Sequence, residues 1–399
     1  MRRNITLYPW FKFLQSLTFW QATWFLYFES NLSASEAILL YVVYDISTTV
    51  LEVPSGYMSD KLGRKLTLMA AAVSGLAAAL LFIFAGDFGA GDFGQFALAN
   101  VLLGAAAAFN SGTDTSLLFE SLKAEGREDE VEAAELTAWR FGFVALALSA
   151  LIGGALALYS DILPYVATAV SAVAVLAVTL LLREPPHAKS TSHREDFSAL
   201  IASLTQPTLL WLLCLSLLMY VFSHIPFVFG QPFIREALDS AGFGTQTPLV
   251  SGGVTFSMMM ISVAVSLVAL PLRKALGLPG ILLLAFGMQI ALTGALATSN
   301  GLFVIALLFF RMVPNSLSQP FIRARIQPLL QDGMRATYMS VQSLAGRVLF
   351  AATLSFAAGR TQDDIPLPYA DMQVILGAYT AIGLVFLLGL ALSLRRAKI

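Results

Sequence analysis

The feature that most constrains this chain is a series of long apolar segments, each close to the length that a helix needs to cross a bilayer. A spanning helix takes about 20 mostly apolar residues. Because hydrocarbon offers no hydrogen-bond partner to a lone strand, each segment is expected to be an α-helix. Applied to the 399 residues, this length predicts an all-α membrane protein with twelve spanning helices: 9–28, 36–58, 66–85, 94–118, 137–159, 163–182, 207–230, 249–271, 280–298, 302–324, 337–358 and 372–394.

Composition agrees with a membrane location and argues against several classes of function. Charged residues make up 12% of the chain, well below the roughly 25% found in soluble proteins. The net charge of -1 gives no reason to expect a nucleic-acid partner. The single cysteine, Cys214, supports neither a disulfide framework nor a zinc site. No phosphate-binding loop or nucleophile motif is present, so we expect no cofactor, no metal and no enzymatic activity.

Basic residues predict how the helices are oriented. Most of the 24 Lys and Arg residues fall in loops on one side, whereas the loops on the other side hold only Arg235 and Arg360. Because positively charged loops stay in the cytoplasm, both termini are expected there, in a bacterial-type inner membrane. The first apolar segment contains Lys12 and Gln15 and no small-residue cleavage site, so we expect a retained helix rather than a signal peptide.

The chain is predicted to consist of two related six-helix halves, residues 1–182 and 207–399. The polar segment 183–206 joins them, and its two prolines and mixed charge are typical of a linker. The basic turn at 60–63 has a weaker counterpart at 274–277, where an internal repeat requires one. Since both halves of a pathway lie in one chain, a monomer is expected to suffice.

The turn after the second apolar segment carries the most specific motif. Residues 52–65 begin in that segment, and Pro54 and Gly56 are expected to break its helix before a tight basic turn. Twelve helices, two halves and a central linker resemble the major facilitator superfamily of secondary transporters. The motif G-x-x-x-D-x-x-G-R-K also resembles the signature loop of that family, and its residues here are Gly56, Asp60, Gly63, Arg64 and Lys65.

The resemblance implies a role for four residues at the cytoplasmic side. Gly56 would allow two helices to approach closely. Asp60 would accept hydrogen bonds from the N-terminus of the eleventh helix, where the helix dipole and free N–H groups favour a carboxylate. Arg64 would pair with Glu120 at the end of the fourth helix. Together these residues would form a gate that latches the two halves.

Two other family motifs are altered in this chain. The helix 4 motif of proton-coupled drug exporters has an arginine four residues before a glycine, whereas this chain has Asn100 before Gly104. The helix 5 motif of antiporters reads Gly-Pro-x-x-Gly-Gly, whereas residues 149–154 read Ser-Ala-Leu-Ile-Gly-Gly. Both changes weaken the inference of proton-driven export.

Acidic residues inside the predicted helices are candidates for proton coupling. Asp45 and Glu52 share one face of the second segment, and Asp114 lies in the polar run 110–116 of the fourth. An unpaired charge at mid-membrane costs about 2.5 kcal/mol or more, so each acid must meet a cavity, a partner or a proton. For Asp45 the alternative is a structural ion pair or a neutral hydrogen-bonded acid. Asn110 and its polar run either line a cavity or form a packing seam between helices.

Basic and polar residues of the second half are candidates for substrate binding. Arg311, Asn315 and Gln319 are expected on one face of the tenth segment, and Arg347 near the middle of the eleventh. Guanidinium groups match carboxylates, so the arginines suggest an anionic substrate; the alternative is that acids and helix carbonyls neutralise them. In the family the second and eleventh helices face each other, which makes an Asp45–Arg347 pair a further hypothesis.

The sequence thus favours a secondary transporter that alternates access to a midplane site. The preferred function is proton-coupled export of a small amphipathic or anionic organic molecule, such as a drug or a carboxylate siderophore. Trp20 is a further candidate for substrate contact, with core packing as its alternative. An importer, exchanger or uniporter of an organic anion is the first alternative, and a lipid-handling or receptor-like membrane protein is the second.

Overall fold

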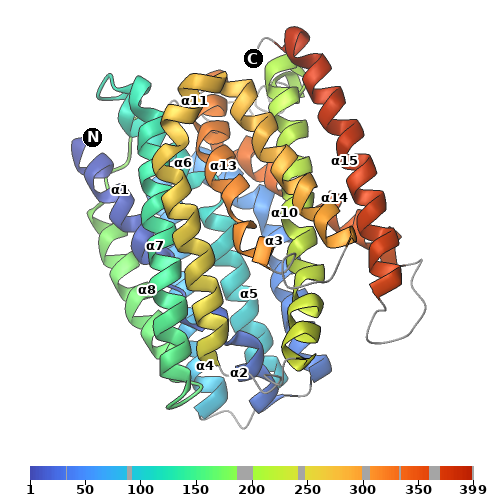
Figure 1. The fold of residues 1–399 in the computed structure, drawn as a ribbon. Coiled ribbons are helices and arrows are strands. Elements are labelled where there is room, and N and C mark those ends of the chain that lie inside the picture. The colour runs from blue at the N-terminus through green and yellow to red at the C-terminus, as the bar shows by residue number, and fades with distance from the viewer. Residues whose placement is uncertain are drawn as a thin grey trace. The chain divides into compact units, whose positions relative to one another are not determined.

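The computed structural model is helical and has no strand in the part of the chain that it describes (Figure 1). The prediction of an all-α membrane protein is confirmed, while the count of twelve spanning helices stays a prediction. The described residues are 1–32, 34–87, 92–186, 201–240, 248–298, 306–331, 334–358 and 369–397. Among them, seven helices are long and apolar enough to cross a membrane: Arg64–Gly86, Phe93–Lys123, Glu128–Ala157, Leu163–Leu181, Pro207–Ile225, Gly253–Thr298 and Gln373–Ala397.

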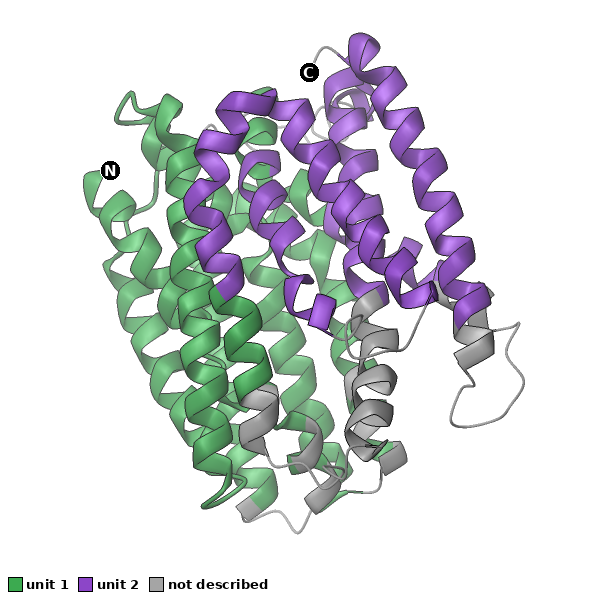
Figure 2. Cartoon of the chain, in the orientation of Figure 1, with its two compact units in different colours: residues 1–200, 247–260, 323–341 green, residues 201–246, 261–322, 342–399 purple. Residues whose placement is uncertain are grey.

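The chain forms two compact units, coloured green and purple in Figure 2. Unit 1 comprises Met1–Leu200, Thr247–Met260 and Arg323–Val341, and unit 2 comprises Ile201–Gln246, Ile261–Ile322 and Gln342–Ile399. Unit 1 therefore includes two short segments from the second half of the sequence. The predicted boundaries of the two halves stay a prediction, and most of the predicted linker, residues 187–200, lies outside the described residues.

Unit 1 is built mainly from the first part of the chain. In it, α4 packs against α5 and α8, α3 packs against α5, and α1 packs against α7 and α8. The segments that unit 1 takes from later in the chain begin α11 and α14 and end α13. Its other elements are α1 (Arg2–Gln15), η1 (Phe19–Ala22), α2 (Trp24–Asn31), α3 (Ala34–Leu62), α4 (Arg64–Asp87), α5 (Phe93–Asn110), α6 (Thr113–Lys123), η2 (Glu128–Glu130), α7 (Val131–Ala157) and α8 (Leu163–Leu181).

The first predicted helix, 9–28, is not continuous. It is divided into α1, the 3-10 turn η1 and α2. A helix break in an apolar environment needs other partners for the freed backbone groups, and α8 supplies them. The hydroxyl of Ser171 donates to the carbonyl oxygen of Leu14 at 2.7 Å, and the backbone N–H of Phe19 donates to the hydroxyl oxygen of Thr168 at 3.1 Å. The prediction was wrong because these partners lie about 150 residues away in the sequence.

Two further expectations about continuity were also wrong. The predicted fourth helix, 94–118, is divided into α5 and α6 at Gly112, which has a positive φ of 71°. Conversely, α3 runs without a break from Ala34 to Leu62 through both Pro54 and Gly56. A proline removes only one N–H donor. The loss is tolerated here, where Ser55 also donates to the carbonyl of Ala108 on α5 at 2.8 Å.

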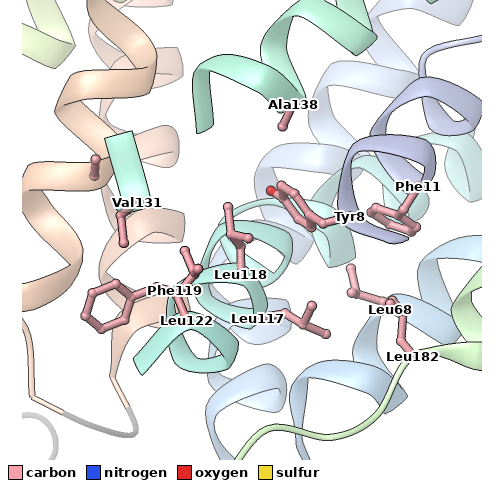
Figure 3. Packing of buried hydrophobic residues seen from close by; sticks show 11 residues of the cluster. Tyr8, Phe11, Leu68, Leu117, Leu118, Phe119, Leu122, Val131, Ala138 and Leu182 are labelled. Carbon is pink, nitrogen blue, oxygen red and sulfur yellow. The ribbon is translucent and has the colours of Figure 1, made fainter. Parts of the chain in front are cut away.

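The buried cores of unit 1 are aromatic and aliphatic. One cluster gathers side chains of α1, α4, α6 and α7, seen in Figure 3, where Tyr8, Phe11, Leu68, Leu117 and Leu118 lie together. A second cluster joins Tyr27, Phe28, Phe82, Phe96 and Tyr165 from α2, α4, α5 and α8. The first cluster includes Tyr8 and Phe119, which lie beside charged side chains described below.

Unit 2 contains most of the helices that follow residue 200. In it, α10 packs against α15: the indole of Trp211 donates to the carbonyl of Leu390 at 3.1 Å, and Thr208 donates to that of Ala397 at 2.7 Å. The elements after residue 200 are α10 (Pro207–Ser240), α11 (Pro248–Thr298), η3 (Leu308–Phe310), α13 (Val313–Ile326), η4 (Gln327–Leu329), α14 (Arg335–Ala358) and α15 (Tyr369–Ala397); α11, α13 and α14 extend into unit 1, and η4 lies there.

Two details of these helices bear on the predictions. The helix expected at 302–324 is interrupted, because η3 and a turn at Arg311 and Met312 precede α13. Within α11, Gly277 has a φ of 72° and divides the element into two helices, as the predicted segments 249–271 and 280–298 require. Gly63 has a φ of 118° in the corresponding turn between α3 and α4. Both positions use the left-handed region that glycine adopts without steric cost.

Candidate functional site

A buried network of charged side chains joins the end of α3, the first residue of α4, α6 and the start of α14 within unit 1. We call it the latch network, and it consists of Asp60, Arg64, Glu120 and Arg335. All four side chains are at most 3% exposed. Two acids and two arginines give a net charge of zero. Because one buried charge without a partner is strongly destabilising, these four groups depend on one another.

Arg64 is the centre of the latch network. Its Nε and Nη2 atoms donate to the two carboxylate oxygens of Glu120 at 3.1 and 2.8 Å. This is the bidentate geometry that makes an arginine–carboxylate pair strong and specific. The Nη1 atom donates to Asp60, four residues earlier at the end of α3, and to the hydroxyl of Ser59 at 3.1 Å. The Arg64–Glu120 contact is the one that the family resemblance implies.

Asp60 connects α3 to the N-terminus of α14. Its Oδ2 accepts from the backbone N–H of Thr337 at 2.8 Å and from the hydroxyl of Thr337 at 2.6 Å. Its Oδ1 accepts from the N–H of Ala336 at 3.3 Å. The first N–H groups of a helix have no partner inside the helix, so the carboxylate satisfies them and lies at the positive end of the dipole.

Gly56 permits this contact by bringing α3 close to α14. A Cβ atom at Gly56 would lie 2.9 Å from the backbone oxygen of Ala336 and 2.9 Å from the Cβ of Ser340. Both distances are shorter than van der Waals contact, so a larger residue would force the helices apart. The structure therefore places Gly56, Asp60, Arg64 and Glu120 in one site, while their gating role stays a prediction.

Sequence reasoning missed Arg335 as a member of this site. Its Nη1 lies 3.4 Å from Glu120 Oε1, and its Nε and Nη2 donate to the carbonyls of Gln327 and Leu330 at 3.1 Å. The guanidinium also lies 4.7 Å from the ring centre of Phe119, a cation–π distance. Arg335 lies before the predicted segment 337–358, where a basic residue is ordinary for a loop. Its position directly before the eleventh predicted helix was the only available signal.

Glu184 is a second residue that sequence reasoning missed. Its two carboxylate oxygens accept from the backbone N–H groups of Arg64 and Lys65, each at 2.8 Å. It thereby caps the N-terminus of α4 directly after the Gly63 turn. This contact fixes the start of the helix that carries Arg64, from a residue at the end of the first half of the sequence.

A second group of ionisable residues, three of them buried and two half-buried, lies among α1, α6, α7 and the end of α13. We call it the inner cluster, and it consists of Tyr8, Lys12, Asp114, Glu135 and Arg323. Lys12 Nζ donates to Asp114 Oδ2 at 2.7 Å. Asp114 also accepts from the backbone N–H of its neighbour Thr115 at 2.7 Å. Of these five residues, sequence reasoning had selected only Asp114.

The guanidinium of Arg323 contacts two first-half residues. Its Nη1 donates to the hydroxyl of Thr115 on α6 at 3.3 Å. The group also lies 5.3 Å from the ring centre of Trp139 on α7. Arg323 thus places a positive charge from the second half of the sequence against α6 and α7.

The remaining first-half candidates are placed as follows. Asp45 is half-buried on α3, and Glu52 is buried on the same helix. Asn110 donates to the carbonyl of Ala106 in its own helix at 3.0 Å, and the choice between a cavity wall and a packing seam stays a prediction. Trp20 stacks on Tyr165 with ring centres 6.3 Å apart and planes 9° from parallel, so it packs against the aromatic core.

The second-half candidates are brought together only in part. Arg311, Asn315, Gln319 and Arg347 are each half-buried in unit 2. Asn315 accepts from the side-chain amide of Gln289 on α11 at 3.4 Å. Asp45 belongs to unit 1 and Arg347 to unit 2, so their pairing stays a prediction.

Comparisons with known proteins identify the family. The family model described as Major Facilitator Superfamily matches residues 10–355. No curated protein was found to match the sequence. Solved structures with the same fold include the human organic anion transporter MFSD10 (TETRAN), with a TM-score of 0.71 and 14% identity over 98% of this chain and 99% of that one.

Two further structures illustrate the range of transporters that share this fold. A bacterial homologue of the iron transporter ferroportin, in an outward-facing state, has a TM-score of 0.71 and 15% identity over 97% of this chain and 98% of that one. The transporter FucP, in the outward conformation, has a TM-score of 0.70 and 15% identity over 96% and 98% of the two chains. At these identities the structures establish the fold alone. With the family match over most of its length, this chain belongs to the Major Facilitator Superfamily and is a membrane transporter rather than an enzyme.

Proposed function

We propose that this chain is a proton-coupled secondary transporter that exports a small amphipathic or anionic organic molecule by alternating access. The observation that carries the proposal is the latch network. It fastens the start of α14 to α3 and α6 through ionic and hydrogen-bonded contacts, which can be made or broken as a unit. A set of such contacts is the two-state element that alternating access requires.

Proton coupling is proposed because several acids lie in segments that the sequence predicts to span the membrane. Glu52 and Asp114 are both at most 3% exposed, and Asp45 lies on the same helix as Glu52. Buried acids in membrane segments are functional candidates by default. Asp114 forms an ion pair with Lys12 at 2.7 Å, and Asp45, Glu52 and Asp114 all remain candidates for proton exchange.

An anionic or amphipathic substrate is proposed from the side chains of unit 2. Arg311 and Arg347 are half-buried there, with Asn315 and Gln319 one and two turns after Arg311. Guanidinium and amide groups together bind carboxylates through directed donors. A carboxylate-bearing metabolite or a siderophore fits this chemistry.

The proposed setting is a bacterial-type inner membrane with both termini in the cytoplasm and a monomeric chain. Its support is the uneven distribution of Lys and Arg along the sequence. In that orientation the latch network faces the cytoplasm, so closing it would shut the inner end of the pathway.

A second function, import, exchange or uniport of an organic anion, is favoured by a specific observation. Asn100 stands where proton-coupled drug exporters have an arginine, and its amide donates to the carbonyl of Phe96 in its own helix at 2.9 Å. This side chain is 4% exposed and carries no charge. A lipid-handling or receptor-like role is kept as the last alternative.

The test is transport by purified protein in proteoliposomes with an imposed pH gradient. Carboxyfluorescein serves as an anionic probe and ethidium as a cationic amphipathic probe. Export coupled to protons predicts that reversing the gradient reverses the direction of net flux, and that Asp45→Asn reduces this dependence. Flux of either probe that ignores the gradient contradicts proton coupling and favours a uniporter. Arg311→Ala and Arg347→Ala should slow carboxyfluorescein more than ethidium; Arg273→Ala, in the basic turn of α11, is the control.

A further inference from the structure

The inner cluster contains a buried acid that no sequence pattern and no family motif points to. Glu135 lies in the second turn of α7 and is 1% exposed. Among the described residues, no hydrogen-bond donor reaches its Oε1 atom. The hydroxyl of Tyr8 also acts electrostatically on Glu135, and the hydroxyl of Thr115 lies beside both groups. A buried carboxylate oxygen without a donor is costly, whereas a neutral carboxyl group carries its own O–H donor.

The charges that face Glu135 come from three other elements. On α1 they are Lys12 and Tyr8, on α6 the charge is Asp114, and at the end of α13 it is Arg323. The cations Lys12 and Arg323, the carboxylate of Asp114 and the hydroxyl of Thr115 all act on the buried Glu135 side chain. Because charges of both signs surround Glu135, the gain or loss of one proton there changes the net charge of the inner cluster.

The other elements packed against α7 bring no further charge to Glu135. The turn η1 (Phe19–Ala22) has no ionisable residue, and the only one on α8, Tyr165, is buried in the aromatic cluster with Tyr27. The three acids of η2 (Glu128–Glu130) are exposed. On α7 itself, the nearest charged residues along the helix are Glu132 and Arg140, both half-buried.

Counting charges shows what one proton would change. With Glu135 ionised, the inner cluster holds two negative groups, Asp114 and Glu135, and two positive groups, Lys12 and Arg323. Lys12 is already paired with Asp114 at 2.7 Å. Protonation of Glu135 therefore removes the negative charge that balances the half-buried Arg323.

Arg323 is linked through its own backbone to the latch network. One turn after it, the carbonyl of Gln327 accepts from Arg335 Nε at 3.1 Å. Arg335 contacts Glu120, and the next two residues donate their N–H groups to Asp60. The segment from Arg323 to Thr337 is thus fastened at one end by the inner cluster and at the other end by the latch network.

We propose that Glu135 is a proton-binding site that controls this segment: with Glu135 ionised, Arg323 stays against α6 and α7, and with Glu135 protonated, Arg323 and the latch network release. The proton comes from water and binds the carboxylate oxygen, so no other reactant is needed. The inference deepens the proposed proton-coupled transport and rests on it for its biological meaning. As a property of the protein, the switch is measurable without any substrate.

The experiment is hydrogen exchange of peptides that cover residues 323–341, in detergent-purified protein at pH 8 and pH 5, corrected for the intrinsic effect of pH on exchange. In the wild-type chain, we expect protection to fall about tenfold at pH 5. Glu135→Gln should show the low protection at both pH values, because the glutamine has no charge to hold Arg323. Glu128→Gln, an exposed acid before the same helix, should behave like the wild type.

Arg323→Gln keeps Glu135 and gives a second readout that does not depend on the folding of the first variant. It should also lose the difference between pH 8 and pH 5. Unchanged pH dependence in Glu135→Gln, or in Arg323→Gln if the first variant fails to fold, would overturn the inference. The proteoliposome assay is separate: a pH switch without proton-driven flux would refute the proposed coupling while leaving the Glu135 site standing.

Discussion

Asp60→Asn is the sharpest perturbation of the latch network. The carboxylate accepts three hydrogen bonds from Ala336 and Thr337 and also pairs with Arg64. Asparagine keeps the size and one acceptor oxygen but removes the charge. The amide nitrogen would then face N–H donors of α14 and the guanidinium of Arg64, and none of these accepts a hydrogen bond. Arg64 and Arg335 would be left to share Glu120.

The size of the effect follows from burial. Asp60 is 1% exposed and Arg64 is fully buried, so solvent screening offers little compensation. Removing one partner of a buried ion pair typically costs about 3–5 kcal/mol. Since about 1.4 kcal/mol is a factor of ten, the equilibrium between the latched and unlatched states should shift by roughly 100-fold to 3000-fold. An exposed pair would contribute about 0–1 kcal/mol.

Hydrogen exchange of the first turns of α14, residues 335–341, measures this shift directly. We expect Asp60→Asn to exchange there at least 100-fold faster than the wild type, with the aromatic core of unit 1 unchanged. Asp129→Asn, an exposed acid in η2, is the matched control and should have no effect. Equal protection in Asp60→Asn and Asp129→Asn would refute the reasoning that these contacts hold α14 in place.

Four other predictions follow from particular contacts. Gly56→Ala should cost about 1–3 kcal/mol through overpacking against Ala336, measured by thermal unfolding, whereas Gly75→Ala, whose Cβ would lie 3.7 Å from Ala106 Cβ, should be nearly neutral. Lys12→Met should destabilise the chain by leaving Asp114 without its cation, and adding Asp114→Asn should recover part of the loss; a double variant as unstable as the sum of the single ones would contradict the pairing. Glu184→Ala should cost about 1 kcal/mol by uncapping α4, checked by exchange at residues 64–67. Contacts with the Met1 ammonium and Arg2 lower the pKa of Glu125. Its contribution is therefore full above the ordinary carboxyl pKa of about 4.3 and is lost as pH falls through the lowered pKa of the folded state, so Glu125→Gln should differ from the wild type in thermal unfolding more at pH 7 than at pH 3.

The sequence could predict those parts of the fold that depend on local signals, namely the length of apolar segments and one short motif. Apolar length placed helices such as α8 and α15 to within a few residues. The motif at 56–65 and the family resemblance that it carries predicted that Asp60, Arg64 and Glu120 lie together. Hydropathy cannot detect breaks such as the one after α1, because the partners that make it tolerable, Thr168 and Ser171, come from a helix far away in the sequence.

The inner cluster was missed for a related reason. The fifth helix was predicted to begin at residue 137, which assigns Glu135 to a loop where an acid is unremarkable. The helix begins at Val131 instead. Glu135 therefore lies in the second turn of α7, where its carboxyl group is buried. Lys12 lay inside a predicted helix, but its partner Asp114 is 102 residues away, and a single sequence contains no signal for such a pairing.

The central claim is that the latch network alternates between a closed and an open state. The most direct test is a spin-label distance between cysteines at Leu62, the last residue of α3, and Gln331, which is exposed after η4, in a Cys214→Ser background. Our account predicts two distance populations whose ratio changes with pH, with Asp60→Asn shifted to the longer one. A single distance that neither pH nor Asp60→Asn changes would contradict it.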